Sequence, residues 1–153
     1  MPRNVVKLTD PPRRKRVNLH VLTIEDAKIL VEACQSHRLG PAYCAMLTLG
    51  LRMGEALGLK WEDIDLDRAT VFVRRALQRV VTDDGHTELQ LVEPKSDRSY
   101  RVPSIPGSIV AMLARHRAQQ NRERLVAGSR WRQTGHTFAS TIGTPLDERN
   151  RPS

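Results

Sequence analysis

The chain has 153 residues, of which 39% are hydrophobic, 27% charged and 4% aromatic. This length suits one domain with a modest core, and no apolar run approaches the roughly 20 residues that span a bilayer. The scarcity of aromatic residues disfavours a base-stacking RNA platform. The formal net charge of +8 favours a polyanionic partner, of which nucleic acid is the commonest. A basic surface without a dedicated partner stays open from charge alone.

Residues 1–22 are interpreted as a basic linker or arm. Pro11 and Pro12 break any helix, and six Lys or Arg residues stand against Asp10 alone, which gives +5 of the net charge. A solvated tail and a strap that contacts phosphates both fit this composition. The candidate DNA contacts in the arm are Arg13, Arg14, Lys15 and Arg16. The domain itself is expected over 23–153.

Helical patterns follow the arm. Thr23 is a helix cap with acidic residues after it, and Pro41 and Gly50 bracket a second helix. The two cysteines lie in apolar helical patterns without metal-ligand spacing, which indicates buried free thiols. The expected helices cover about 23–37, 42–49, 53–58 and 108–126.

Between the third and fourth helices the pattern changes to strands. β-rich or alternating segments and a turn signal at 83–85 favour a small antiparallel meander. The predicted fold class is therefore α+β, mainly helical with a small three-stranded antiparallel sheet. Its strands are expected at 70–73, 88–92 and 100–103.

Residues 49–65 are the most informative stretch and read LGLRMGEALGLKWEDID. Arg52 follows a helix-ending glycine, so its guanidinium can point outward while the leucines are buried. The planar fork of arginine matches two phosphate oxygens, and Glu55 is close enough to brace it. Two other interpretations stay open from the residues alone. One is an ordinary surface ion pair, and the other is a helix-turn-helix over 50–65 with 55–58 as its turn.

The ordered string at 49–65 resembles the first catalytic motif of the tyrosine recombinases, the phage-integrase family. The sequence LTIEDA at 22–27 resembles the opening helix of that catalytic domain, and PKSDRSYRVP at 94–103 resembles the β-turn that bears its lysine. Residues 138–150 resemble the segment before its second catalytic helix. The resemblance covers nearly the whole chain and implies a partial tyrosine-recombinase catalytic domain.

The resemblance also implies roles for individual residues. Arg52 would grip the scissile phosphate and stabilise transition-state charge, Glu55 would support the site, and Lys95 would protonate the departing 5′ oxygen as general acid. Further DNA contacts are expected from Lys60, Arg98 and Arg101. The implied partners are double-stranded DNA and other recombinase protomers. The implied setting is the cytoplasm, with no membrane, metal or small-molecule cofactor.

The family also uses a His-x-x-Arg motif, a further His or Trp, and a tyrosine nucleophile, none of which is found at its place here. The tyrosines are Tyr43, in an apolar helix, and Tyr100, beside the lysine turn. His136 follows Gly135 rather than an arginine and is interpreted as a loop histidine. We therefore expect a catalytic domain truncated at both ends that binds DNA at most. A small non-catalytic DNA-binding protein or regulator derived from an integrase is the alternative.

Overall fold

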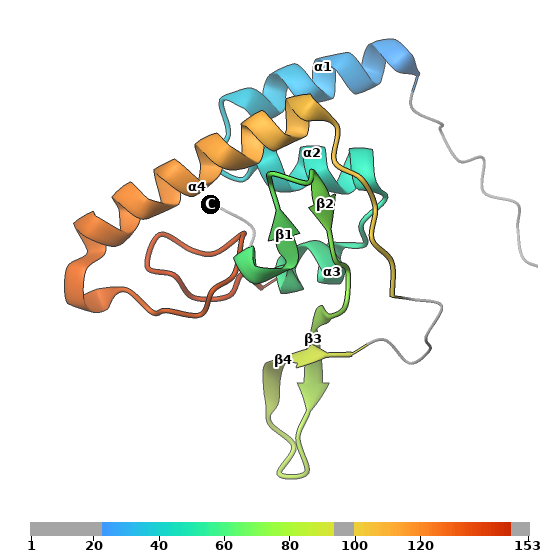
Figure 1. Ribbon diagram of the computed structural model, residues 1–153. Helices are drawn as coiled ribbons and strands as arrows, with labels where there is room; N and C mark the ends of the chain where they lie inside the picture. Colours follow the sequence, from blue (N-terminus) through green and yellow to red (C-terminus); the bar gives the residue numbers. More distant parts are fainter. Residues whose placement is uncertain (1–22, 94–99, 148–153) are drawn as a thin grey trace, which may run out of the picture.

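The computed structural model describes residues 23–93 and 100–147, and places three helices together above the strands (Figure 1). α2 (Gly40–Leu49) packs against α1 (Ile24–Gln35), α3 (Met53–Gly58) and α4 (Gly107–Ala127). Short 3-10 helices cover Trp61–Asp63 and Gly128–Arg130. The predicted arm at 1–22 and the lysine turn at 94–99 lie outside the described residues.

The helix boundaries follow from their capping residues. Thr23 Oγ1 accepts a hydrogen bond from Asp26 N at 3.1 Å, and Thr23 N donates to the Asp26 carboxylate at 3.1 Å, so both exposed amides are satisfied. Pro41 lies in the first turn of α2, and Gly50 ends that helix with φ of 61°. The four predicted helices are confirmed. Among the described residues, no helix is long and apolar enough to cross a membrane.

The strands confirm the α+β class but correct the predicted sheet. β1 (Ile64–Asp65) pairs with β2 (Thr70–Val71), and β3 (Ala76–Val81) pairs with β4 (Thr87–Val92), each antiparallel. The strand β3 was missed because its sequence, ALQRVV, does not alternate between apolar and polar residues. Because β3 pairs with the predicted 88–92 strand, these two strands form a separate hairpin and do not belong to a three-stranded sheet.

The predicted strand at 100–103 instead runs beside the segment that contains β2. Val73 N donates to Arg101 O at 2.9 Å, and Val71 N donates to Pro103 O at 3.1 Å. The helix-turn-helix interpretation is wrong, because the supposed turn at 55–58 is itself helical and leads into a 3-10 helix and β1.

The core lies between α2, α4 and the strands. Its fully buried side chains include Cys44, Val71, Leu113 and Phe138. Both cysteines are buried and free, as predicted. The burial of Phe138 brings the segment after α4 into the same core as the motif at 49–65.

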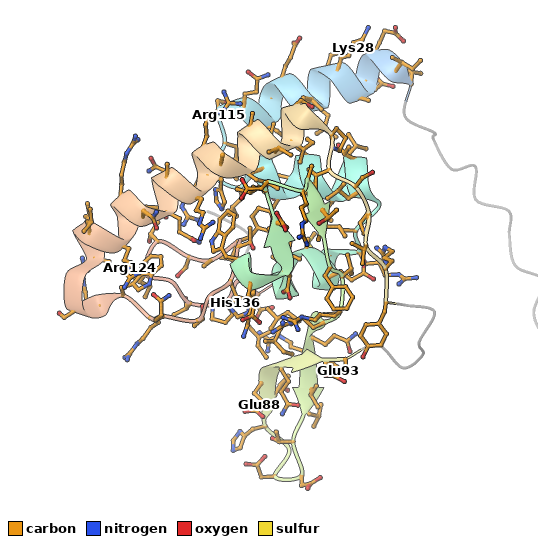
Figure 2. All side chains as sticks on the ribbon, in the orientation of Figure 1. Lys28, Glu88, Glu93, Arg115, Arg124 and His136 are labelled. Carbon is orange, nitrogen blue, oxygen red and sulfur yellow. The ribbon has the colours of Figure 1, made fainter. Side chains whose placement is uncertain are left out.

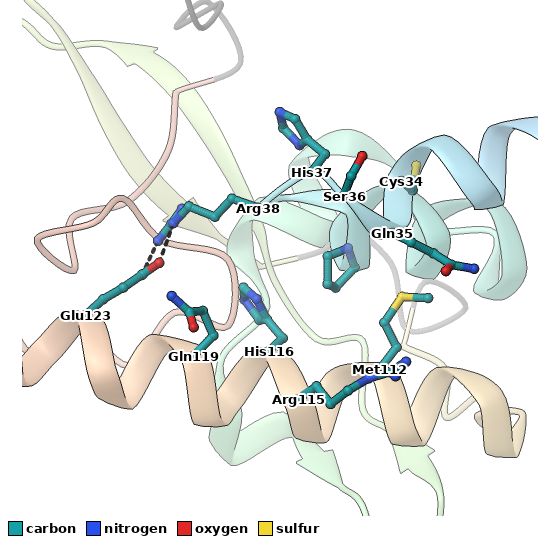
Figure 3. Close-up of a pocket in the computed structure, with 11 residues that line it drawn as sticks. Cys34, Gln35, Ser36, His37, Arg38, Met112, Arg115, His116, Gln119 and Glu123 are labelled. Atoms are coloured by element: carbon teal, nitrogen blue, oxygen red, sulfur yellow. Dashed lines mark hydrogen bonds and ion pairs between the residues drawn. The ribbon is translucent and has the colours of Figure 1, made fainter.

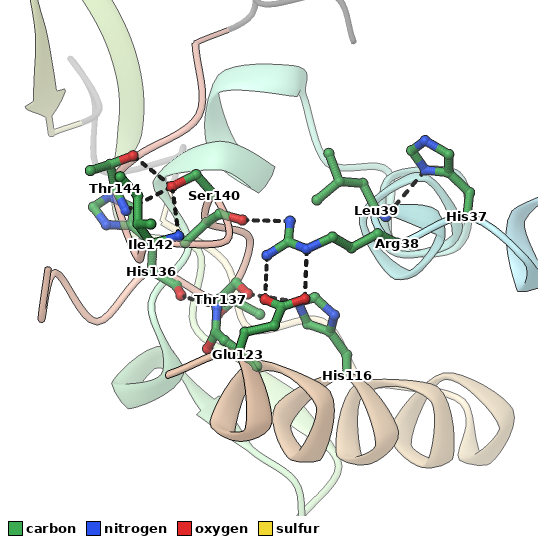
Figure 4. Close-up of polar contacts among 12 residues, drawn as sticks. His37, Arg38, Leu39, His116, Glu123, His136, Thr137, Ser140, Ile142 and Thr144 are labelled. Atoms are coloured by element: carbon green, nitrogen blue, oxygen red, sulfur yellow. Dashed lines mark hydrogen bonds and ion pairs between the residues drawn. The ribbon is translucent and has the colours of Figure 1, made fainter. Parts of the chain in front are cut away.

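Arg38 ties three parts of the fold together (Figure 4). Its Nε donates to Glu123 Oε1 at 2.8 Å and one Nη to Glu123 Oε2 at 2.5 Å, which joins the α1–α2 turn to α4. Its other Nη donates to Ala139 O at 2.8 Å. A bidentate, partly buried pair of this kind fixes geometry as well as contributing energy.

Two glycines let α3 lie directly on β3. A Cβ at Gly58 would be 2.7 Å from Leu77 N, and one at Gly54 would be 2.8 Å from Leu77 O. These contacts are with backbone atoms, which cannot rotate away. The close approach of α3 to the first residues of β3 therefore requires glycine at positions 54 and 58.

Substitution Gly58→Ala is expected to lower the free energy of unfolding by about 2 kcal/mol, because overpacking forces the backbone to shift. Urea denaturation monitored by circular dichroism measures this value. Gly107→Ala is the matched control, since no heavy atom lies within 4 Å of the added Cβ. Equal stability of the two variants would contradict the close packing of α3 on β3.

Candidate functional site

Arg52 occupies the turn between α2 and α3. Gly50 takes the left-handed conformation there, and Arg52 is extended, with φ of −70° and ψ of 156°, at the N-terminus of α3. The neighbouring Leu51 is buried while the Arg52 side chain is 79% exposed. The turn therefore presents a guanidinium to solvent, as the sequence predicted.

Glu55 braces this arginine from beneath. Its Oε1 accepts from Arg52 Nη1 at 3.1 Å, and its Oε2 accepts from the backbone N of Arg52 at 2.8 Å. The Glu55 side chain is only 9% exposed. The interpretation of Arg52 and Glu55 as an ordinary surface ion pair is therefore excluded, because the Glu55 side chain is buried.

Arg101 is the third member of the site, and reaches it from the segment after the lysine turn. It donates to Glu55 Oε2 at 2.7 Å and Oε1 at 3.2 Å, and to the carbonyl O of Gly50 at 3.1 Å. It thus holds both the carboxylate and the turn that carry Arg52. Sequence spacing gave no sign of this contact, because Arg101 lies 46 residues from Glu55.

The electrostatics keep the carboxylate ionised. Burial raises the pKa of Glu55, but hydrogen bonds from Arg101 and the Arg52 backbone, with the attraction of both guanidinium groups, hold that pKa below its ordinary value. One buried negative charge therefore faces two positive charges. The excess positive charge is available to an anion at the exposed Arg52.

A second set of charges fixes the other end of the motif. The Asp63 side chain is 1% exposed and accepts from Arg74 Nε at 2.5 Å and Arg75 at 3.0 Å. Its other oxygen accepts from the backbone N of Lys60 at 3.0 Å. Lys60, a predicted DNA contact, is half-buried, and its backbone bridges to His136 beyond the end of α3.

His136 lies on a backbone bridge rather than at a reactive centre. Trp61 N donates to Gly135 O at 3.0 Å, and Thr137 N donates to Leu59 O at 2.8 Å. The imidazole is buried, and neither ring nitrogen has a hydrogen-bond partner among the described residues. Burial, with Lys60 and Arg75 nearby, lowers the pKa of His136 to about 4.

The folded state should therefore lose stability in mild acid. Between an unfolded pKa of 6.5 and a folded pKa of about 4, the unfolded chain binds a proton that folded His136 does not. The stabilisation is complete above pH 6.5 and is lost as the pH falls through about 4, by up to about 3 kcal/mol.

His136→Leu is expected to flatten the dependence of unfolding free energy on pH in this window, as measured by urea denaturation at several pH values. The exposed His86→Leu on the β3–β4 hairpin serves as control. A variant at His136 with the wild-type pH dependence would show that another group causes the acid loss.

A cavity of about 510 Å³ lies between the α1–α2 turn and α4 (Figure 3). Cys34, His37, Met112 and His116 are among its lining residues, and no member of the Arg52 site belongs to it.

Within residues 23–93 and 100–147, no group of three or more His, Cys, Asp or Glu side chains is arranged to hold a metal ion.

The structure thus brings together Arg52, Glu55 and Arg101 from the predicted site. Six predicted site residues lie outside the described residues. They are the predicted general acid, Lys95, and the predicted DNA contacts Arg13, Arg14, Lys15, Arg16 and Arg98. Glu93 separates the 94–99 segment from the end of β4, and Tyr100 follows that segment. Tyr100 OH contacts Glu93 Oε2 at 3.5 Å, which brings the two flanks of that segment together.

Comparison with curated proteins finds clear relatives. The chain is 33% identical over 147 residues to a XerC-like tyrosine recombinase of Caldanaerobacter subterraneus subsp. tengcongensis, a match covering 92% of this chain and 38% of that protein. An integrase of Streptomyces ambofaciens is 29% identical over 154 residues, covering 97% and 38% respectively. The chain thus spans well under half the length of these relatives. No family model matches the sequence.

Solved structures share the fold. The Tn1549 transposon integrase, in complex with transposon right end DNA, superposes with a TM-score of 0.65 at 19% identity, covering 94% of this chain and 44% of that one. The XerA recombinase gives a TM-score of 0.60 at 23% identity, covering 90% and 40%. At these identities the likeness establishes the fold. The sequence similarity to the curated relatives, which extends over nearly the whole of this chain, supports a tyrosine recombinase catalytic domain, of which these residues match part.

Proposed function

We propose that the chain binds the phosphate backbone of duplex DNA in site-specific recombination, with Arg52 as the phosphate ligand. The observation that carries this proposal is the contrast within the site. Arg52 is largely exposed, whereas its carboxylate partner is buried and held by Arg101. A guanidinium oriented in this way can accept a phosphate without first having to be ordered.

In this proposal Glu55 and Arg101 position Arg52 rather than contact the reacting atoms. Glu55 fixes the guanidinium and the backbone from below. Arg101 keeps Glu55 ionised and holds the Gly50 carbonyl. The position of Arg52 is thus set by a buried network and not by its own long side chain.

Lys95 is proposed to act at the same phosphate as a general acid. Its place in sequence supports this role, because it lies within six residues of Arg101, which touches Glu55. Protonation of a departing 5′ oxygen requires a donor close to the phosphate that Arg52 holds. Arg98 and the basic arm at 13–16 are proposed as further phosphate contacts.

The 153 residues are proposed to bind DNA without cleaving it when they act by themselves. Tyr43 lies on α2 with its ring centroid 6.0 Å from that of His37. Tyr100 adjoins the 94–99 segment, where the resemblance gives no nucleophile. A phosphotyrosine link needs a tyrosine oxygen aligned behind the phosphate. The sequence contains no His-x-x-Arg motif, which also supports the proposal that these residues do not cleave DNA.

A suicide DNA substrate and a duplex-binding titration test these two parts separately. We expect retardation of a random-sequence duplex at low salt, with affinity that falls steeply as salt rises, and no covalent protein–DNA band. A covalent band would overturn the non-cleaving part. The absence of duplex binding at low salt would overturn the DNA-binding part.

Relatives provide the context for recombination. The first curated relative is called a tyrosine recombinase, and the Tn1549 integrase was solved with transposon end DNA. We accordingly propose that any strand exchange involving this chain depends on residues supplied in addition to these 153. Other recombinase protomers are the expected source if the chain acts in an assembly.

A further inference from the structure

One face of α4 carries a repeat that the core does not use. The helix buries residues such as Ile109, Leu113 and Gln120 against the domain. On the opposite side, apolar or uncharged residues recur at spacings of three, four, three and four. They are Ala111, Ala114, Ala118, Asn121 and Leu125, and all are exposed.

This row has the spacing of a coiled-coil seam. Leu125 in this row is 83% exposed, so it contributes nothing to the core and is available to a partner. The alanines are small enough to let another helix approach closely. The row extends over 14 residue steps, or about 21 Å of helix, which is enough for three to four turns of contact.

Arginines line both sides of the row. Arg115 and Arg122 flank it on one side, and Arg117 and Arg124 on the other, so they occupy the positions next to the seam that select a partner in coiled coils. Figure 2 shows Arg115 and Arg124 on α4. All four are exposed, and in the described part of the chain none makes an ion pair.

The acidic residue within this stretch of α4 is already engaged. Glu123 is held by Arg38 across the α1–α2 turn, so it does not neutralise its arginine neighbours. Arg117 lies over the Trp61 ring at 5.3 Å, which orients it without cancelling its charge. The row and its four flanking arginines together form what we call the α4 face.

We propose that the α4 face binds an acidic amphipathic helix of a partner protein, with leucine or alanine along its seam and glutamates beside it. Pairing with a second copy would set arginine against arginine, and like charges at these positions repel. Duplex DNA fits less well, because a phosphate backbone is best met by cations at the centre of a face. Here the centre is alanine and leucine, and the cations are at the edges.

The probe is a fluorescein-labelled peptide of four heptads with leucine at both seam positions and glutamate beside them. A matched peptide has lysine in place of each glutamate. Fluorescence anisotropy with the full chain should give an acidic-peptide Kd at least tenfold lower than that of the basic peptide. Equal affinity for the two peptides, or no binding of either, would overturn the proposal.

Charge reversal locates the binding. The double variant Arg122→Glu, Arg124→Glu should weaken the acidic peptide at least tenfold and strengthen the basic one. Lys28→Glu, Arg68→Glu changes the net charge equally at exposed sites off this helix and should alter the acidic-peptide affinity less than threefold. Equal losses in the two double variants would show attraction to the overall charge rather than a docking face.

Two further measurements separate an apolar seam from a nucleic-acid surface. Leu125→Ala leaves the charge unchanged and should weaken the acidic peptide about threefold, with no effect on binding of a random 20-base-pair duplex. If the α4 charge reversal reduces duplex binding but leaves peptide binding intact, the face is a DNA surface and the helix proposal is wrong.

Discussion

Replacing Asp63 by asparagine is expected to lower the free energy of unfolding by about 3 kcal/mol, because two arginines lose their buried carboxylate partner and keep only the exposed Glu62. The variant keeps the shape of the side chain but removes the charge that faces Arg74 and Arg75. Arg75 is only 16% exposed and cannot move fully into water. Urea denaturation at neutral pH measures the loss.

Asp67→Asn is the matched control for this experiment. Asp67 is exposed in the turn between β1 and β2, and surface substitutions of this kind change stability by about 0.5 kcal/mol or less. If Asp63→Asn is as mild as the control, the network at the end of α3 does not hold the motif, and the arrangement of Arg74 and Arg75 around Asp63 is wrong.

Glu55→Gln should lower the free energy of unfolding by about 2 kcal/mol, because the guanidinium groups lose their buried carboxylate partner. The loss is smaller where a guanidinium can reach solvent. Arg52 is largely exposed, so most of the cost comes from Arg101. The same change should also weaken duplex binding, because Arg52 then loses the group that orients it.

The stability effect of Glu55→Gln is compared with that of Glu32→Gln on the exposed side of α1. Separate measurement of unfolding and duplex binding is essential here. A variant that loses stability but keeps its DNA affinity at a temperature where it stays folded would show that Glu55 supports the fold and does not position Arg52.

The helices and the Arg52–Glu55 pair could be predicted because their determinants are local. Thr23, Pro41 and Gly50 mark helix ends within a few residues, and the spacing of Arg52 and Glu55 is a property of one turn.

The sheet and the bracing contacts could not be predicted because they join distant parts of the chain. Arg101 meets Glu55 across 46 residues, and Arg38 meets Glu123 across 85. Nothing in the local pattern marks Arg101 as a residue that turns inward. That choice depends on the pairing of the 101–105 segment with the distant 69–73 segment that contains β2, and this pairing exists only after folding.

The most direct test of the account is the salt dependence of duplex binding by Arg52→Ala. The Arg52 side chain is largely exposed and buries little surface on folding, so the variant should melt at the wild-type temperature. Its DNA affinity should fall about tenfold, and the slope of log affinity against log salt should be shallower by about 0.9, the loss of one phosphate contact. Arg68 is 85% exposed and pairs with Asp65 rather than with Glu55, so Arg68→Ala should retain the wild-type slope. A wild-type slope and affinity for Arg52→Ala would contradict the assignment of Arg52 as a phosphate ligand.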